Sequence, residues 1–348
     1  MKLAVFDFGT RASRMLIGNI EEVKEHGFDF DYFKNVGELT ELGNGLIEID
    51  KNIYELRIKY LDKTVSFIRR YLKMAKKENI EFKNIIAVGT EVFRRANNTI
   101  QIIDTIKQAT NLKINVLSPI EEAKTSFYAV AASFSEENMG KGPFAVIEQG
   151  GGSIQITVGE IKYDGSIDTL AQTSIGELGT LLLRKKFIDF SNDRQHVKTV
   201  KKIVYDYATS TINKVLKEKF LLKLDNNINR AYGIGTGVTT FYKGSNRKIH
   251  GKVIMNSELY NSTNSFLDNY NNYAVKSLIK DARDLQIPGE DEASVYKKLE
   301  SYYSLPCYKA VLDYFKISDL KICGTGLRYG VFFRKIYNEW NDIEIYNG

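Results

Sequence analysis

Two short segments of the chain, about 140 residues apart, carry nearly the same pattern. Each has an apolar stretch that ends near a carboxylate, then a glycine turn and a second apolar stretch, and the turns read VFDFGT from Val5 and VIEQGGGS from Val146. Glycine lets the backbone turn so that successive N–H groups point into one concavity, where an anionic phosphate binds. Asp7 and Glu148, at the strand ends, are placed to hold a divalent cation facing that phosphate. We therefore predict a duplicated α/β protein that holds phosphates between two lobes.

The element expected after each glycine turn is a strand, and this separates the chain from commoner phosphate-binding loops. Walker loops and dinucleotide fingerprints run strand, turn, helix and need GxxxxGK[ST] or GxGxxG, and neither pattern fits at these two positions. Strand, turn and strand with phosphate in the turn resembles the actin-like ATPase superfamily. The resemblance implies an α/β fold of two actin-like, ribonuclease H-like lobes with a cleft between them.

Length and composition fit a two-domain globular protein. A chain of 348 residues is long for one hydrophobic core, and it has no apolar run as long as a membrane span. Asp7 and Arg11 interrupt the first apolar run, which predicts a strand and not a signal peptide. The net charge of +6 suits a small polyanion, but equally an ordinary solvated surface. We expect neither a nucleic-acid partner nor a membrane partner.

The cysteines and histidines are few and far apart along the chain: Cys307, Cys323, His26, His196 and His250. This spacing indicates neither a disulfide framework nor a zinc site, and it favours a reducing, cytoplasmic environment.

Hydrophobic periodicity divides the chain into two lobes, which we expect at 1–124 with 320–348 and at 125–319. In the first lobe we predict strands at 2–8, 14–20, 28–36, 84–89 and 113–117, and helices at 51–79, 98–110 and 119–134, the last capped by Ser118. In the second lobe we predict strands at 143–149, 153–162, 166–175, 229–234 and 319–323, and helices at 176–188, 194–219, 256–285 and 290–315. A terminal helix over 324–340 should return to the first lobe.

Seven segments, in order along nearly the whole chain, resemble motifs of the exopolyphosphatase and guanosine pentaphosphate phosphohydrolase family. They read DFGT from Asp7, GTEVFRRANN from Gly89, SPIEEA from Ser118, EQGGGS from Glu148, SIG from Ser174, GIGTGVTT from Gly233 and GLRYG from Gly326. The chain is short, so it is similar to the two-domain members that lack an appended helical domain. Dimers are common in that family, which makes a homodimer an expectation here.

The resemblance implies a phosphoanhydride hydrolase acting on inorganic polyphosphate or on a guanosine penta-/tetraphosphate-type nucleotide. In the carboxylate pair Glu121–Glu122 it implies that Glu122 activates the attacking water. It also implies that Arg94 binds the terminal phosphate. Helix N-terminal charge complementarity remains the other explanation for Glu122, and an ordinary ion pair for Arg94. The implied phosphate-binding residues are Gly9, Thr10, Arg11, Gly150, Gly151, Gly152, Ser153, Gly235 and Thr236. The implied ligands of Mg²⁺ or Mn²⁺ are Asp7, Glu148 and Gln155.

Three residues depart from the family pattern: Glu148 replaces an aspartate, Gln155 a glutamate and Arg11 an asparagine. An amide binds a hard cation less well than a carboxylate, and Arg11 adds positive charge near the anion. The enzyme therefore uses Asp7 and Glu148 alone for its metal, or phosphate binding has been kept while turnover has weakened. The second possibility makes the chain a sensor of polyphosphate or a phosphorylated nucleotide. A third reading, an actin-like ATP-dependent kinase or ATPase, requires an adenosine pocket near 233–240.

Overall fold

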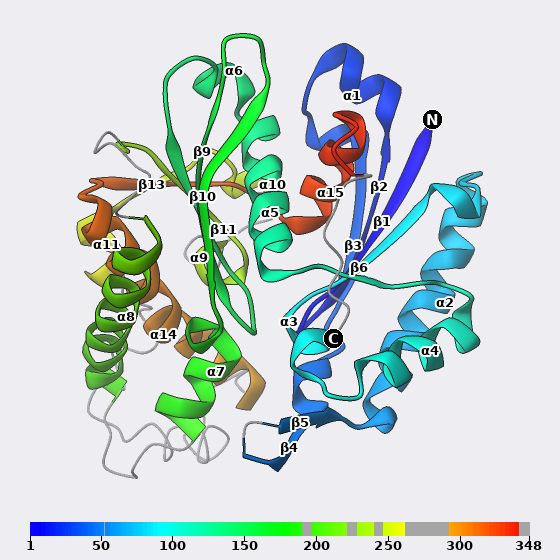
Figure 1. Ribbon diagram of the computed structural model, residues 1–348, viewed down its shortest axis with the longest axis horizontal. Coiled ribbons are helices and arrows are strands. Elements are labelled where there is room, and N and C mark those ends of the chain that lie inside the picture. Colours follow the sequence, from blue (N-terminus) through cyan, green and yellow to red (C-terminus); the bar gives the residue numbers. More distant parts are fainter. Residues whose placement is uncertain (52, 190–196, 221–227, 240–245, 262–291, 341–348) are drawn as a thin grey trace.

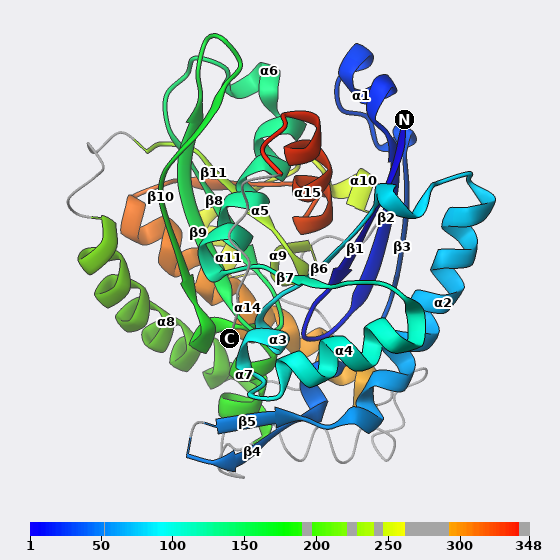
Figure 2. The same ribbon diagram turned by 45° about the vertical axis from the view of Figure 1, so that its right-hand side comes forward.

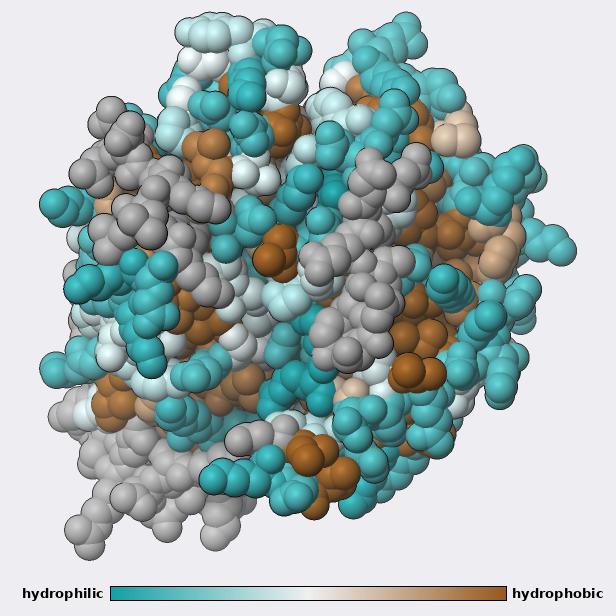
Figure 3. Space-filling view, in the orientation of Figure 1, coloured by the Kyte–Doolittle hydropathy of each residue, from teal (hydrophilic) through white to brown (hydrophobic). Residues whose placement is uncertain are grey.

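Two sheets, each flanked by helices, form the two lobes of the molecule (Figure 1). The computed structural model describes residues 1–51, 53–189, 197–220, 228–239, 246–261 and 292–340. On the face shown in Figure 3, a notch separates the upper ends of the lobes, and hydrophilic side chains surround the hydrophobic ones. Among the described helices, none combines the length and the apolar character needed to cross a bilayer.

The first sheet has the order β3-β2-β1-β6-β7. Its strands are β1 (Lys2–Phe8), β2 (Ser13–Asn19), β3 (Phe33–Glu38), β6 (Ile85–Gly89) and β7 (Asn115–Val116). Strands β1, β2 and β3 form an antiparallel meander from the first three predicted strands, and β6 and β7 add parallel strands. Strand β3 begins five residues later than predicted, because residues 20–26 form a short helix, α1 (Ile20–His26), and a 3-10 turn follows at Phe30–Tyr32.

Both faces of the central strand β1 are buried. Side chains on a strand alternate between the two faces of the sheet, so its residues divide between two clusters. From β1, Ala4, Phe6 and Phe8 pack under α2 (Asp62–Lys77) and α4 (Thr99–Thr110). Leu3 and Val5 point the other way, towards α5 (Pro119–Ser133) and α15 (Leu327–Ile336). The nearly continuous apolar run of β1 therefore reports burial on two sides. This burial fixes Asp7, the next-to-last residue of β1, at the end of a rigid strand.

The helix predicted over 51–79 is wrong in its first part. Strands β4 (Leu46–Asp50) and β5 (Ile53–Leu56) form an antiparallel pair, a 3-10 turn covers Ile58–Leu61, and only then does α2 begin. The Asn98 side chain accepts a hydrogen bond from the Leu56 N–H and donates one to the Leu56 carbonyl, at 3.0 Å each. A residue more than 40 positions away thus holds this segment extended, which the local apolar spacing cannot show.

The second sheet has the order β10-β9-β8-β11-β13-β12 and repeats the plan of the first. Its strands are β8 (Phe144–Gln149), β9 (Ile154–Ile161), β10 (Ile167–Ile175), β11 (Ala231–Ile234), β12 (Val253–Met255) and β13 (Asp319–Ile322). Again an antiparallel meander, β8 to β10, comes first, and parallel strands β11 and β13 follow. The long helices α8 (Val197–Phe220) and α14 (Glu292–Phe315) pack together and cover this sheet (Figures 1 and 2).

Several shorter elements differ from the prediction. The helix predicted over 176–188 is a 3-10 turn (Gly176–Leu178), the helix α7 (Thr180–Arg184) and a π turn (Lys185–Asp189). Of the helix predicted over 256–285, α11 (Asn256–Asn261) is present, and 262–285 lies outside the described residues. The remaining short helices are α3 (Glu91–Arg95), α6 (Ser135–Asn138), α9 (Thr236–Thr239) and α10 (Asn246–Ile249).

Helices α5 and α15 pack against each other where the two sheets meet (Figure 2). Helix α15 contacts β1 and β2, so the chain returns to the first lobe as predicted. The expected lobe boundary at 320 needs correction, because β13 pairs with β11 and β12 in the second sheet. Parallel pairing of Tyr232 with Lys321 places this strand, and the return to the first lobe begins after it. The division of the chain into domains otherwise stays a prediction.

An aromatic cluster joins the lobes on the side of α10. His250 stacks on Phe134, with ring centroids 4.4 Å apart, and also contacts Phe28 and Phe30 of the first lobe. The Nδ1 atom of His250 accepts a hydrogen bond from the Gly324 backbone N–H at 3.1 Å. Burial, with a smaller contribution from Lys321, lowers the pKa of His250 to about 4. The imidazole is therefore held neutral in the folded protein.

We expect this histidine to make the protein less stable in mild acid. The folded-state pKa lies below the ordinary value of 6.5, so the stabilisation is complete above pH 6.5 and is lost as the pH falls towards 4. The free energy of unfolding should fall by roughly 1 to 2 kcal/mol between pH 7 and pH 5 from this group. Urea unfolding of wild type and His250→Phe at both pH values measures it, since phenylalanine keeps the stacking and has no proton to gain. Identical pH dependence in the two proteins would show that His250 is not the cause.

Candidate active site

A cleft of about 200 Å³ lies between the β1–β2 and β8–β9 turns. The same hydrogen bond closes both turns: Gly9 N–H donates to Ala12 O at 3.0 Å, and Gly150 N–H donates to Ser153 O at 2.9 Å. The residues that line the cleft are Asp7, Gly9, Thr10, Arg11, Ala12, Arg14, Thr90, Glu91, Glu122, Glu148, Gln149, Gly150, Gly151, Gly152, Ser153, Gly235, Thr239, Thr325, Gly326, Leu327 and Arg328. Both predicted turns thus border one space.

The two turns face each other at close range. A methyl group added at Gly151 would lie 3.4 Å from Thr10 Cβ and 3.5 Å from Arg11 Cβ. At Gly152 the added carbon would come within 2.7 Å of Thr10 Oγ1 and within 2.6 Å of Glu91 Cγ. Here glycine is required because a side chain would separate the two turns.

Neighbouring backbone groups orient the peptide units of both turns. The carbonyls of Thr10 and Arg11 accept hydrogen bonds from Gly43 and Glu41, each at 2.8 Å. In the second turn, the carbonyls of Gly150 and Gly151 accept from Thr180 and Leu181, at the start of α7, each at 2.9 Å. The peptide bond is planar and trans, so the N–H of each unit points away from its bound carbonyl. These bonds therefore fix the direction of the N–H groups in both turns, and phosphate binding by them stays a prediction.

Four carboxylates line the cleft: Glu91, which binds Arg94, and Asp7, Glu122 and Glu148. Asp7 and Glu148 occupy equivalent positions, next to last in β1 and β8, and Glu122 comes from the first turn of α5. Burial raises the pKa of Glu148 to about 8, with further increases from Glu122 and Asp7, while a hydrogen bond donated by Ser126 opposes the rise. Burial also raises the pKa of Asp7 and of Glu122. The cleft thus concentrates acidic groups that repel one another.

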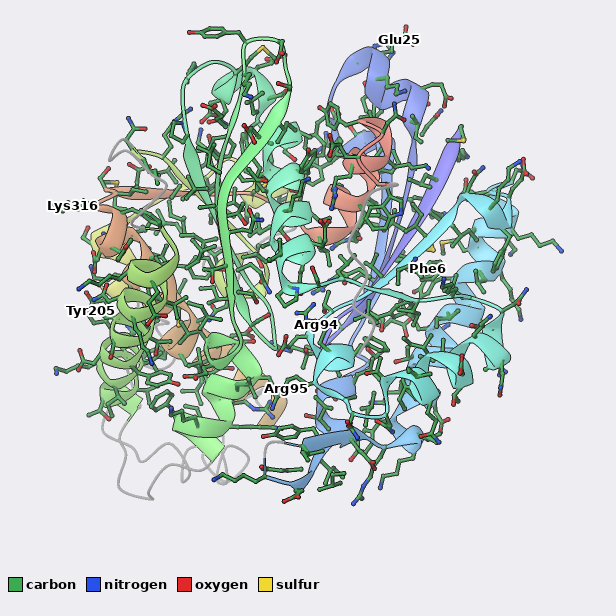
Figure 4. All side chains as sticks on the ribbon, viewed as in Figure 1. Phe6, Glu25, Arg94, Arg95, Tyr205 and Lys316 are labelled. Carbon is green, nitrogen blue, oxygen red and sulfur yellow. The ribbon has the colours of Figure 1, made fainter. Side chains whose placement is uncertain are left out.

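Arg94 is bound by protein groups and is not among the residues lining the cleft. Its Nη2 donates to Glu122 Oε2 at 2.6 Å and to Glu91 Oε2 at 2.9 Å, and its Nη1 donates to Leu117 O at 2.7 Å. The next residue, Arg95, stacks over the ring of Tyr54 in β5 (Figure 4). The structure thus contains the ion pair considered as the alternative for Arg94, and phosphate binding by this residue stays a prediction.

The two adjacent glutamates of α5 have separate environments. Glu121 Oε2 accepts a hydrogen bond at 2.5 Å from Nη1 of Arg334, which also donates to Thr125 Oγ1 at 2.8 Å. Successive residues on a helix point about 100° apart, so Glu122 reaches the cleft while Glu121 faces α15. Ser118 caps this helix as predicted, accepting a hydrogen bond from Glu121 N–H at 3.2 Å. Of the expected catalytic pair, only Glu122 lines the cleft.

Gln155, the third expected metal ligand, does not line the cleft. It lies opposite Glu148 across the β8–β9 pair, and its Nε2 donates to Ser153 Oγ at 2.6 Å. Within the described ranges, no group of three His, Cys, Asp or Glu side chains is arranged to hold a metal ion. A metal in this cleft therefore has two candidate protein ligands from the expected set, Asp7 and Glu148.

Two arginines line the cleft that the sequence analysis did not single out, Arg14 and Arg328. Arg328 is buried and donates from Nε to Asn35 Oδ1 at 2.9 Å. Burial, with repulsion from Arg14, lowers the pKa of Arg328 to about 10. Neither guanidinium forms a salt bridge with a carboxylate in the described part of the chain. Asp7 and Glu148 line the same cleft and attract both arginines without forming a salt bridge with either. Guanidinium donors that no carboxylate holds in a salt bridge can bind an anion.

A sequence signal for Arg14 existed, because Asp7 and Arg14 lie at equal distances from the first turn and pair across β1 and β2. Arg328 belongs to the GLRYG segment that resembles a family motif, but nothing in the sequence places it beside Arg14, which lies more than 300 residues away along the chain. Of the remaining expected residues, Gly235 lines the cleft beside Thr239. The side chain of Thr236 lies outside the described part of the structure.

Comparison with known proteins agrees with this architecture. The model of the Ppx/GppA phosphatase family matches residues 26–339. The bifunctional 3-dehydroquinate synthase/phosphatase of Fusobacterium nucleatum is 27% identical over 311 residues, which are 86% of this chain and 43% of that protein. The chain thus spans less than half the length of this curated relative.

Solved structures share the fold over both lobes. A Ppx/GppA family member from Aquifex aeolicus superposes with a TM-score of 0.68 at 21% identity, covering 97% of this chain and 98% of that one. An exopolyphosphatase from Cytophaga hutchinsonii superposes with a TM-score of 0.67 at 17% identity, covering 97% and 98%. The two-lobe actin-like fold and the resemblance in the motifs are therefore confirmed. Because the family model covers most of its length, the chain belongs to the Ppx/GppA phosphatase family.

Proposed function

We propose that this protein removes the terminal phosphate from inorganic polyphosphate or from a guanosine penta-/tetraphosphate-type nucleotide. The observation that carries the proposal is the cleft, in which two opposed glycine turns meet several carboxylates and arginines, among them Glu122, Arg14 and Arg328. A linear phosphate chain needs donors on more than one side, and the carboxylates provide a base and metal ligands next to those donors.

The phosphates would be bound by the N–H groups of both turns and by Arg14 and Arg328. These two guanidinium groups offer planar sets of donors suited to phosphate oxygens. The geometry supports this assignment better than the expected role of Arg94, whose guanidinium already binds Glu91 and Glu122.

A divalent cation fits beside Asp7 and Glu148. Burial raises the pKa of both carboxyl groups, and repulsion from Glu122 and Asp7 raises that of Glu148 further, so a bound cation would favour the charged form of each. Mg²⁺ is commonly held by one or two carboxylates together with substrate phosphates, and it keeps several waters. When bound, the ion would neutralise negative charge on the phosphoryl oxygens.

Glu122 is the group we assign as general base. Its carboxylate lines the cleft, and the Nη2 of Arg94 holds one oxygen in place at 2.6 Å. A water molecule that gives its proton to this carboxylate attacks the terminal phosphorus, and the bond to the bridging oxygen breaks. The products are inorganic phosphate and a chain one phosphate shorter. Arg94 thereby becomes a positioning residue for Glu122.

We also propose that the protein works in the cytoplasm. Both cysteines, Cys307 and Cys323, are buried free thiols, as expected where disulfides do not form. A homodimer stays a prediction.

Replacing Glu122 by glutamine tests hydrolysis against mere binding. The amide keeps the shape and loses the basicity, so kcat should fall by about 10²- to 10⁴-fold while ligand affinity changes little. Phosphate release is measured from long-chain polyphosphate, pppGpp and ATP, with Mg²⁺ and with Mn²⁺. Glu121→Gln is the matched control, because the same change one residue earlier faces Arg334 instead of the cleft. Equal release by wild type and Glu122→Gln would overturn the assignment, and no release by wild type would favour the sensor.

The arginine pair should control affinity for the anion. Arg14→Gln and Arg328→Gln should each weaken binding of a non-hydrolysable polyphosphate analogue by about tenfold or more, since each removes a charge-assisted hydrogen bond. Isothermal titration calorimetry at two salt concentrations measures the loss. Arg69→Gln is the control, since Arg69 binds the Ala109 carbonyl at the surface of the first lobe. If all three variants bind equally well, the pair is not a phosphate site.

Metal binding can be followed without turnover. A ligand that binds only the folded state raises the melting temperature, so Mg²⁺ with inorganic phosphate should raise it in wild type and much less in Asp7→Asn. Asp104→Asn, on the exposed side of α4, should behave as wild type. An unchanged increase in Asp7→Asn would exclude Asp7 as a ligand.

A further inference from the structure

Arg11 links the two lobes at the edge of the cleft. It lies in the first glycine turn, and its Nη1 donates to Glu300 Oε2 at 2.5 Å. Glu300 belongs to α14 in the second lobe, and its side chain is only 1% exposed. A charged residue of one phosphate-binding turn is therefore held by a buried carboxylate of the opposite lobe.

The Arg11 guanidinium has donors to spare. Arginine carries five N–H groups, and among the described residues the only acceptor that it reaches is Glu300. Its side chain is 31% exposed and lines the cleft. The backbone of Arg11 is fixed as well, because its carbonyl accepts from Glu41 and a methyl group at Gly151 would lie 3.7 Å from its nitrogen. Arg11 is thus held at its backbone by Glu41 and at its guanidinium by Glu300.

The only hydrogen-bond partner of the Glu300 carboxylate among the described residues is Arg11. Its Oε1 atom is buried and has no hydrogen-bond partner in the described part of the chain. A buried carboxylate with one oxygen unsatisfied destabilises the fold, and an apolar residue of similar volume is often as good or better there. The benefit that offsets this loss of stability is the ion pair with Arg11.

We infer that Glu300 is a positioning residue for phosphate binding. The ion pair holds the Arg11 guanidinium between the two glycine turns, and its remaining N–H groups bind an oxygen of the phosphate chain. Without Glu300, the long side chain would have to be ordered when the ligand binds, at a loss of affinity. This inference rests on the proposed function, because it assumes that the cleft binds a phosphate chain.

A double-mutant cycle tests the inference without turnover. The probe is methylenediphosphonate, a non-hydrolysable analogue of pyrophosphate, with affinity measured by calorimetry. Arg11→Ala should weaken binding by about tenfold or more. Glu300→Gln should weaken binding roughly two- to tenfold in the wild-type background and have no effect in the Arg11→Ala background. Equal losses in both backgrounds, or no loss in either, would overturn the role.

Two further variants keep the result decisive. Glu300→Asp retains the charge in case Glu300→Gln fails to fold, and it draws the carboxylate back by one methylene, so affinity should still fall. Full affinity in a folded Glu300→Asp would overturn the inference. Arg247→Ala removes another arginine that joins the lobes, through Asp31, and it should leave affinity unchanged. A loss there equal to that of Arg11→Ala would show that any contact between the lobes acts in the same way.

The measurement also separates this inference from the proposed hydrolysis. A protein that binds the analogue with the expected cycle but releases no phosphate contradicts the hydrolase and supports the role of Glu300. If wild type releases phosphate and the Glu300→Gln variant binds the analogue as tightly as wild type does, the proposed hydrolysis stands and the role of Glu300 is overturned.

Discussion

The two glycine turns can touch because no side chain stands between them, and the rest of the site depends on this contact. Gly151 and Gly152 lie against Thr10 and Arg11, so the backbones of the two lobes approach directly. Each turn is the end of a hairpin whose two strands are almost completely buried, which prevents it from moving alone. The sheets, the packing of α5 on α15 and the aromatic contacts of His250 all keep that approach in place.

Electrostatics divides the arginines near the site into two groups. Arg94, Arg334 and Arg11 are each paired with a glutamate, and the first two are almost completely buried. Such pairs fix geometry more than they stabilise the fold, because desolvation offsets most of the attraction. Arg14 and Arg328 form no salt bridge within the described ranges, and they border the cleft beside Asp7 and Glu148, whose negative charge acts on both. The site therefore has arginines in salt bridges with glutamates close to Glu122, and two arginines without a salt bridge in the wall of the cleft.

The same division separates the acids. Glu121 is neutralised by Arg334 on the side of α15, and Glu300 by Arg11. Asp7 and Glu148 face the cleft with raised pKa values, because burial acts on both and repulsion from Glu122 and Asp7 acts on Glu148 as well. Glu122 lies between the two groups, since it borders the cleft and is also held by Arg94. That position suits a base that must keep its place and still exchange a proton.

Local sequence determined those features that local physics controls. The glycine turns, the carboxylates beside them, the Ser118 cap and most strands follow from glycine's backbone freedom, the alternation of side chains on strands and the chemistry of helix ends. The duplication was visible for the same reason, because it repeats a local pattern. Even the pair Asp7–Arg14 could have been found from its spacing about the turn.

Only the tertiary structure decided the features that depend on distant residues. It made residues 53–56 a strand, through Asn98, placed β13 in the second sheet, and bound Arg94 to Glu122. It also brought Arg328 beside Arg14, and Glu300 to Arg11 across 289 positions of the chain. Whether a charged side chain faces a ligand or another side chain depends on which distant group reaches it first. Nothing in the neighbouring sequence records that competition, and the packing of the two lobes settles it.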